Sequence, residues 1–229
     1  MADPRKLPIT GHAGKPLDNQ FWPADQSVGA LAILLPGLNY TMDMPVMFFP
    51  RRLLLWRNVD VLNLNPNARS AEFQSVTEIK ELAWLQNDVQ AGMKVGLAQA
   101  RYQRLILVGK SIGSLAIAVG AEFAQSVLPT ALVWLTPLFR YDIVIQAALT
   151  ATGPQVHICG GADSTYKPDL LRQILAVKSD ASAYIAEGAN HNLEVPGNDQ
   201  ATFAGFSEAM LILGKFLDSV LMQSTAGKL

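Results

Sequence analysis

The chain has 229 residues, of which half are apolar and only 16% are charged, and its formal net charge is −1. This composition excludes a disordered chain, since about 25% charged residues is usual even for globular proteins. It offers no basic excess for a phosphate backbone, so we expect no nucleic-acid partner. The length suits a single domain over 1–229, with a core over about 30–221 and an N-terminal extension or edge strands over 1–28.

The sequence also restricts compartment and cofactor. Cys159 is the only cysteine, which excludes an intrachain disulfide framework and a thiolate metal site. The sequence also has no G-x-G-x-x-G pattern for a dinucleotide, and we expect no metal and no cofactor. Residues 1–6 lack the apolar stretch of a signal peptide. Prolines interrupt the uncharged stretches Phe123–Phe139 and Ile143–Ala162, so we expect no membrane span and a cytoplasmic location. Nothing in the sequence indicates an oligomeric state.

Short apolar runs bounded by turn residues alternate with helical patterns along the chain. Such runs are typical of strands that are buried on both faces of a sheet. The predicted strands are Ala30–Leu35, Val59–Leu64, Arg104–Val108, Ala131–Leu135, Gln155–Cys159 and Ser182–Ala186. The alternation predicts an α/β fold, a mostly parallel sheet with helices on both faces. In such sheets ligands bind beyond the carboxyl ends of the strands.

Four helices are expected between or after these strands. The first begins at a candidate capping box, Ser75 to Glu78, and continues with Ile79 in its apolar stripe to about Gln99. The others are Ile112–Ser126, Lys167–Lys178 and a stripe from Phe203 to Val220. The connection between the fourth and fifth strands has about twenty residues, enough for a helix but not for a large cap domain. We therefore expect an open site.

The third strand leads into Gly109-Lys110-Ser111-Ile112-Gly113, a G-x-S-x-G pattern between a strand and a helix. A serine on a very sharp strand-to-helix turn requires glycines two residues away on either side, because side chains there would collide with backbone. The alternative is a tight turn with a serine helix cap. A phosphate-binding loop is rejected, because it needs glycine where Arg104 stands.

A serine nucleophile needs a base, and the sequence has only three histidines. His12 lies in the polar N-terminal segment. His157 lies inside the fifth predicted strand, where a core histidine with satisfied hydrogen bonds is the more common case. His191 follows the sixth strand on a polar loop, at the correct end of the sheet, and is the candidate base.

The base in turn needs an orienting carboxylate. Asp163 follows the fifth strand and is the candidate, although an Asx turn or a helix cap would also explain it. Asp142 and Asp169 are weaker candidates, because each lies inside or at the start of a predicted helix.

Backbone donors for an oxyanion are expected after the first strand. A turn at Gly37 can direct the Leu38 N–H to the same point as the Ile112 N–H. Residues 40–49 offer either an apolar wall for a substrate or a segment that packs onto the sheet edge. The tentative substrate-pocket residues are Asn39, Tyr40, Met42 and Phe139.

These elements at the strand ends, in the chain order Ser, Asp, His, resemble the alpha/beta-hydrolase superfamily in its small, cap-less form. The resemblance covers about 30–220 and implies that Ser111 is the nucleophile, His191 the general base and acid, and Asp163 the orienting carboxylate. It also implies that Leu38 and Ile112 donate the oxyanion hydrogen bonds. Many members have histidine where this chain has Pro36, and others have proline.

A serine nucleophile indicates acyl transfer from a small-molecule acyl substrate. The expected function is cleavage of a carboxylic ester or related acyl bond through an acyl-enzyme, and a thioester or amide substrate fits the same machinery. An acyltransferase on the same site and a non-catalytic binding module with this fold are the alternatives.

Overall fold

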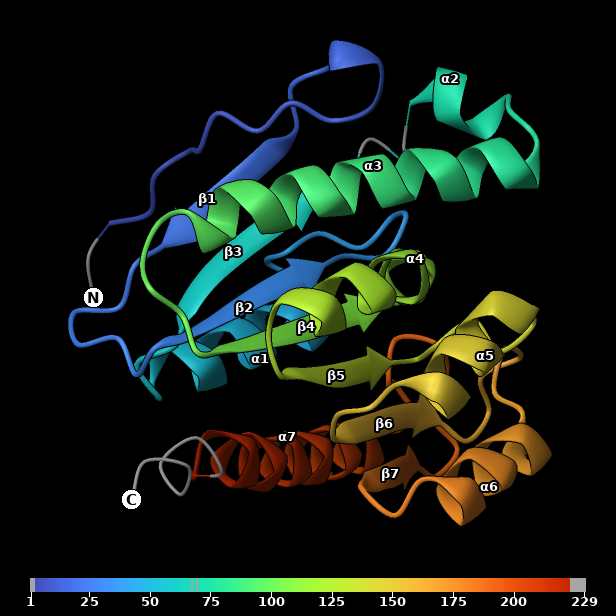
Figure 1. Ribbon diagram of the computed structural model, residues 1–229. Coiled ribbons are helices and arrows are strands. Elements are labelled where there is room, and N and C mark those ends of the chain that lie inside the picture. Colours follow the sequence, from blue (N-terminus) through green and yellow to red (C-terminus); the bar gives the residue numbers. More distant parts are fainter. Residues whose placement is uncertain (1–2, 67, 69, 223–229) are drawn as a thin grey trace.

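The computed structural model describes residues 3–66, 68 and 70–222. Its sheet has seven strands in the order β1-β3-β2-β4-β5-β6-β7. The strands are β1 (Asp18–Trp22), β2 (Ala30–Leu35), β3 (Asp60–Asn65), β4 (Arg104–Lys110), β5 (Thr130–Leu135), β6 (Gln155–Gly160) and β7 (Ala181–Ala186). Only β1 is antiparallel to its neighbour, so the carboxyl ends of the other strands lie at one edge (Figure 1).

The predicted α/β fold and its six predicted strands are confirmed, with small differences at the strand ends. The largest difference is in β4, which continues through Gly109 to Lys110 because both residues still pair with β5. The additional strand β1 lies within residues 1–28, where an extension or edge strands are expected. It pairs with β3 at the edge of the sheet.

Helices cover both faces of the sheet. They are α1 (Pro45–Leu55), α2 (Ala71–Gln74), α3 (Glu78–Leu97), α4 (Ile112–Val127), α5 (Asp142–Thr150), α6 (Pro168–Val177) and α7 (Asp199–Met222), and a short 3-10 turn η1 spans His12–Gly14. One core lies between the sheet and α3, α4, α5 and α6, and the other lies between the sheet and α1 and α7 (Figure 1). The strands between these layers are almost fully buried, as their apolar sequences predict.

The predicted capping box is wrong. Ser75 ends the short helix α2, and its hydroxyl donates to the Glu72 carbonyl at 2.8 Å. Helix α3 begins only at Glu78, with Thr77 at its N-cap position. Ile79 is 81% exposed and lies outside the buried stripe of α3. The prediction fails because the short helix α2 ends at Ser75, where the sequence pattern predicts the start of the next helix.

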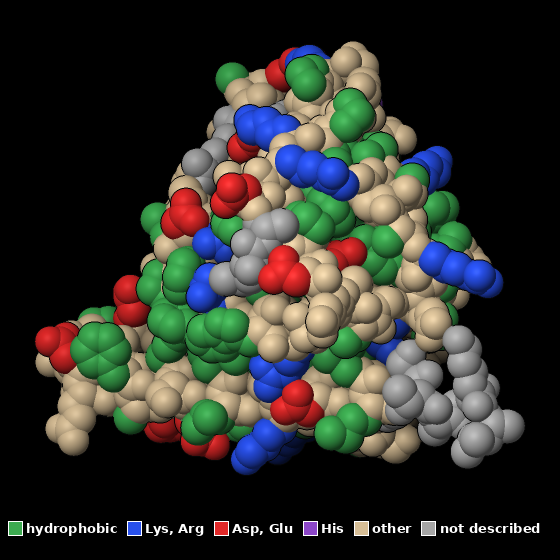
Figure 2. Space-filling view, turned by 90° about the vertical axis from the view of Figure 1, so that its left-hand side faces the viewer, with side chains coloured by type: hydrophobic (Ala, Val, Ile, Leu, Met, Phe, Trp, Pro, Cys, Tyr) green, Lys and Arg blue, Asp and Glu red, His purple; other side chains and the backbone are tan. Residues whose placement is uncertain are grey.

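The end of the molecule that carries the amino ends of the parallel strands has both charge signs on its surface. Figure 2 shows the end opposite the carboxyl ends of the parallel strands, where lysines and arginines are interspersed with acidic side chains. Within the described ranges, no helix is both long and apolar enough to span a membrane.

His157 in β6 is a core residue, as predicted from the sequence. Its ring is fully buried and stacks on Trp134, with ring centroids 5.8 Å apart, and it also lies 6.1 Å from the ring of Phe139. The expected hydrogen bonds are not there: neither ring nitrogen has a partner among the residues the structure describes. Burial without compensation lowers the pKa of His157 to about 3.

The buried imidazole should make the fold sensitive to acid. Below pH about 6.5 the histidine of the unfolded chain gains a proton that folded His157 does not accept until about pH 3, so stability falls as the pH falls through this window. Between pH 7 and 5 this group should remove about 2 kcal/mol from the free energy of unfolding. Urea unfolding at both pH values should show a smaller loss for His157→Leu than for the wild type. An equal loss in both proteins would contradict the expectation.

Asp88 holds the N-terminal segment on α3. Its fully buried carboxylate accepts from the His12 backbone N–H at 2.7 Å and from the indole N–H of Trp84 at 3.1 Å. Asp88→Ala would leave these donors without their acceptor, so we expect a loss of about 2–4 kcal/mol in the free energy of unfolding. Gln86→Ala is the control, because Gln86 is exposed on the same helix; it should lose less than about 0.5 kcal/mol by denaturant titration. Equal losses in the two variants would show that Asp88 is no anchor.

Candidate active site

The turn between β4 and α4 places Ser111 at the carboxyl edge of the sheet. Ser111 has a φ of 54° and a ψ of −117°, a strained conformation for a residue with a side chain. A Cβ atom on Gly109 would lie 2.4 Å from the Gly113 carbonyl oxygen, and one on Gly113 would lie 2.1 Å from the Leu35 carbonyl oxygen. The two glycines are therefore required by backbone contact, as the G-x-S-x-G pattern predicts.

Hydrogen bonds from neighbouring segments hold this turn. The Ser111 N–H donates to the Leu135 carbonyl at the end of β5, at 3.1 Å. The Ser114 hydroxyl donates to the Ser111 carbonyl at 2.6 Å and accepts from the Leu138 N–H at 3.0 Å. Ser114 therefore ties the turn to the loop after β5. This role of Ser114 could not be predicted from the sequence, because its partner Leu138 lies 24 residues away.

The loops after β6 and β7 bring Asp163 and His191 together. The His191 Nδ1 lies 2.7 Å from the Asp163 Oδ2, a short hydrogen bond. The aspartate side chain is 1% exposed and the imidazole is 33% exposed. The carboxylate is thus buried behind a ring that reaches the surface, which directs the second ring nitrogen away from the aspartate.

Thr165 is a further member of this cluster that the sequence analysis missed. Its backbone N–H and its hydroxyl both donate to the Asp163 Oδ1, each at 2.9 Å. Burial alone would raise the pKa of Asp163, but the hydrogen bonds from His191 and Thr165 outweigh it and hold that pKa below its usual value. The signal was the turn Asp163-x-Thr165, which the sequence analysis considered only as an alternative to a catalytic role.

The turn after β2 lies beside the serine. A Cβ atom on Gly37 would lie 3.4 Å from the Ser111 Cβ. The Tyr40 N–H donates to the Gly37 carbonyl at 3.3 Å, which closes the turn around Leu38. Leu38 directly follows Gly37, which lies beside Ser111. Ile112, the residue after Ser111, begins α4. Leu38 and Ile112, the two predicted oxyanion donors, line one small cavity together with Gly37 and Gly113.

The tentative pocket residues separate into three environments. Asn39 is exposed, whereas Tyr40 and Met42 line a cavity of about 290 Å³ beside Pro36. The other lining residues are mostly polar, namely Asp18, Asn19, Gln20, Thr41, Asp43, Asn63 and Asn65. Phe139 is a correction: it is 2% exposed and packs in the core beside α4 and α5, so its side chain cannot line an open pocket.

The apolar stretch over 40–49 mostly packs on the sheet. Pro45 starts α1, and Val46 and Met47 are fully buried in the core beneath α1 and α7. Phe49 is 39% exposed and meets Phe206 of α7 edge-on. Of the two alternatives, packing onto the sheet is therefore the one observed for these residues.

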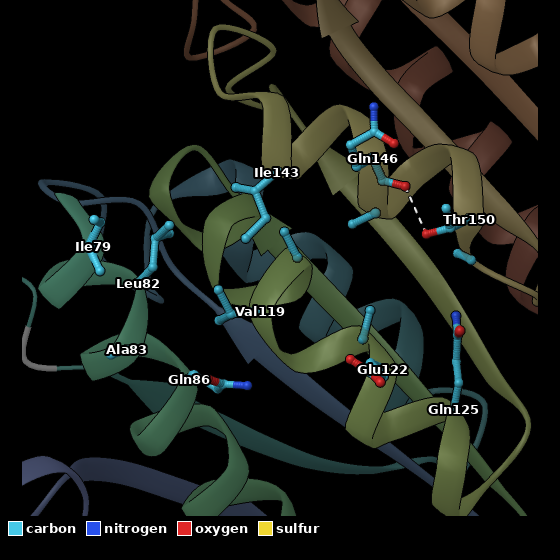
Figure 3. A pocket seen from close by; sticks show the side chains of 14 residues that line it. Ile79, Leu82, Ala83, Gln86, Val119, Glu122, Gln125, Ile143, Gln146 and Thr150 are labelled. Atoms are coloured by element: carbon cyan, nitrogen blue, oxygen red, sulfur yellow. Dashed lines mark hydrogen bonds between the residues drawn. The ribbon is translucent and has the colours of Figure 1, made fainter.

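A second cavity lies away from these loops. A groove of about 660 Å³ runs between α3, α4 and α5, and residues such as Leu82, Glu122 and Gln146 line it (Figure 3). Its lining comes from these three helices and Ala151, so it lies on a helical face and not at the strand ends.

The remaining candidates lie elsewhere or in structural contacts. His12 stacks on Trp84 near the N-terminal segment. Asp142 begins α5, and Asp169 pairs with Arg172 on the surface of α6, as their expected helical positions imply. In the described part of the chain, no group of three or more His, Cys, Asp or Glu side chains could hold a metal ion.

Comparisons with known proteins agree with this architecture. No family model and no curated protein sequence matches the chain. Among solved structures, Est1E from Butyrivibrio proteoclasticus with bound ferulic acid superposes with a TM-score of 0.73 at 12% identity, over 92% of this chain and 98% of that one. A serine hydrolase without a lid from Xanthomonas campestris has a TM-score of 0.70 at 18% identity, over 96% and 95%. An esterase from Pyrococcus furiosus has a TM-score of 0.71 at 17% identity, over 95% and 92%.

The sheet order, the nucleophile turn and these similarities define the class of fold. The chain has the alpha/beta-hydrolase fold, the one that its sequence pattern resembles. In this chain the connection from β5 to β6 holds only the helix α5, which leaves no space there for a large cap domain.

Proposed function

We propose that the protein is a serine hydrolase that cleaves a carboxylic ester or a related acyl bond through an acyl-enzyme. The observation that carries the proposal is the 2.7 Å contact between His191 Nδ1 and the buried Asp163, at the strand ends where the strained turn presents Ser111. The similar structures support it, because their names describe esterases and a serine hydrolase.

Acylation follows from the roles of these groups. The Ser111 Oγ attacks the carbonyl carbon while its proton passes to Nε2 of His191. Asp163 keeps the Nδ1 proton in place and stabilises the imidazolium that forms. The Leu38 and Ile112 N–H groups and the amino end of α4 stabilise the tetrahedral oxyanion. When the intermediate collapses, the leaving alcohol takes the proton from His191, and the acyl group stays on Ser111.

Deacylation repeats the same steps with water. The water oxygen attacks the acyl carbon while His191 takes a proton from the water. His191 then returns a proton to the Ser111 oxygen. The carboxylic acid leaves and the site is restored. No other group is needed for the proton balance of either half-reaction.

The first test is covalent labelling. Intact-protein mass spectrometry after treatment with a fluorophosphonate probe should show one adduct on the wild type and none on Ser111→Ala. Hydrolysis of p-nitrophenyl esters of increasing acyl length should then be measured on wild-type protein that has not been treated with the probe. Absence of an adduct on folded wild type would overturn the proposal and favour the binding-module alternative, and acyl transfer to an added alcohol in preference to water would favour the acyltransferase.

A further inference from the structure

Lys110, the residue directly before Ser111, is a buried cation that the proposed mechanism does not use. It is the last residue of β4 and is only 1% exposed. Its side chain lies on the same face of the strand as Ile106 and Val108, towards α1 and α7. A lysine at such a position needs specific partners, because a buried ammonium without them is strongly destabilising.

The partners of the ammonium are two loops of the candidate site. Its Nζ donates to the backbone carbonyl of His191 at 3.1 Å. The same Nζ lies 4.3 Å from the centroid of the Tyr40 ring, within the range of a cation–π interaction. Tyr40 is itself held, because its hydroxyl accepts from the Val46 N–H at 3.0 Å. The ammonium thus bridges the histidine loop and the turn after β2.

The lysine stem also contacts the turn that carries Leu38. A Cβ atom on Gly37 would lie 3.7 Å from the Lys110 Cδ and 3.4 Å from the Ser111 Cβ. The Lys110 side chain therefore contacts the His191 carbonyl and the Tyr40 ring, and it lies beside Gly37. It is covalently adjacent to the nucleophile, so movement of any of these segments relative to Ser111 must move or break its contacts.

We propose that Lys110 is a positioning residue, whose buried ammonium holds the His191 loop and the Gly37–Tyr40 turn in register with Ser111. The inference rests on the proposed serine-hydrolase function. The protonated form of Lys110 should hold these segments, because the neutral amine makes a weaker hydrogen bond to the His191 carbonyl and loses the cation–π attraction to the Tyr40 ring.

The charge of Lys110 should depend on pH in the working range. Burial lowers the pKa of Lys110 to about 8, although Asp163 and Glu194 act in the opposite direction. The groups that face it are Asp163 from the loop after β6, His191 and Glu194 from the loop after β7, and Tyr40 from the turn after β2. As the pH rises through about 8 the cation is lost, so kcat should decline on the alkaline side.

The test compares Lys110→Met with Arg104→Met. Arg104 is a matched control, because it is 7% exposed on the same strand and face but lies at the opposite end of β4. With p-nitrophenyl acetate, Lys110→Met should lower kcat by about ten- to a hundredfold, with KM within about threefold. Its melting temperature should stay or rise, because a buried charge is removed. Arg104→Met should keep the wild-type kcat.

The pH profile distinguishes positioning from a merely structural role. The wild type should lose kcat above about pH 8, and Lys110→Met should lack this alkaline decline. An unchanged kcat in Lys110→Met would overturn the inference, and so would a wild-type kcat that stays constant above about pH 8. A lower kcat in Lys110→Met accompanied by a lower melting temperature would also overturn it. The wild-type profile answers the question even where the variant does not fold. Failure of the wild type to react with a fluorophosphonate would instead overturn the proposed function.

Discussion

Ser111→Ala should lower kcat for ester hydrolysis by about a millionfold, the effect typical of removing the nucleophile of a triad. The residual activity would come from substrate binding and the oxyanion donors. The loss should fall on kcat rather than KM, because the hydroxyl forms its bond in the transition state and not in the bound ground state. Steady-state hydrolysis of a p-nitrophenyl ester measures both constants.

Ser126→Ala is the matched control for this variant. Ser126 lies on the same helix, α4, with an exposed side chain that donates to the Phe123 carbonyl. It should keep full activity. A loss of less than about tenfold in Ser111→Ala would exclude Ser111 as the nucleophile, since binding effects alone can account for a change of that size.

Asp163→Asn should lower kcat by about ten thousandfold, with the fold retained. The amide has almost the same shape, but its NH₂ group can face His191 Nδ1 and stabilise the tautomer with the proton on Nε2, which then cannot accept the proton of Ser111. Wild-type Asp163 is held ionised, because its pKa is lowered by the bonds from His191 and Thr165. The effect should appear in the acylation rate measured by the release of p-nitrophenol in the first turnover.

Asp169→Asn makes the same chemical change at a carboxylate outside the site. Asp169 is exposed on α6 and pairs only with Arg172 among the contacts described. This variant should behave like the wild type. If Asp163→Asn kept more than about a tenth of the wild-type kcat, another group would have to orient His191, and the assignment of the acid would be wrong.

Much of the fold could be predicted because its determinants are local. A continuous apolar run that ends at a proline or glycine predicts a buried strand and its end, as for Ala30–Leu35 and β2. The clash that requires Gly109 and Gly113 arises within a few residues of Ser111 or with the neighbouring strand, so the pattern alone predicts the turn. The capping-box error has the same origin, since a local pattern at Ser75 fits a helix end as well as a helix start.

Local sequence patterns are enough to predict the α/β class, the carboxyl edge as the place of the site, and the serine, aspartate and histidine that could act there. Which side chains come into contact depends on the packing of the whole fold. The contact of Lys110 with His191 spans 81 residues and that of His191 with Asp163 spans 28, and no periodicity or turn preference encodes such distances. The burial of Phe139, and the lack of hydrogen-bond partners for His157 within the described residues, likewise depend on packing from several elements. These features depend on the way the sheet brings distant loops together, which is a property of the whole fold and not of any segment.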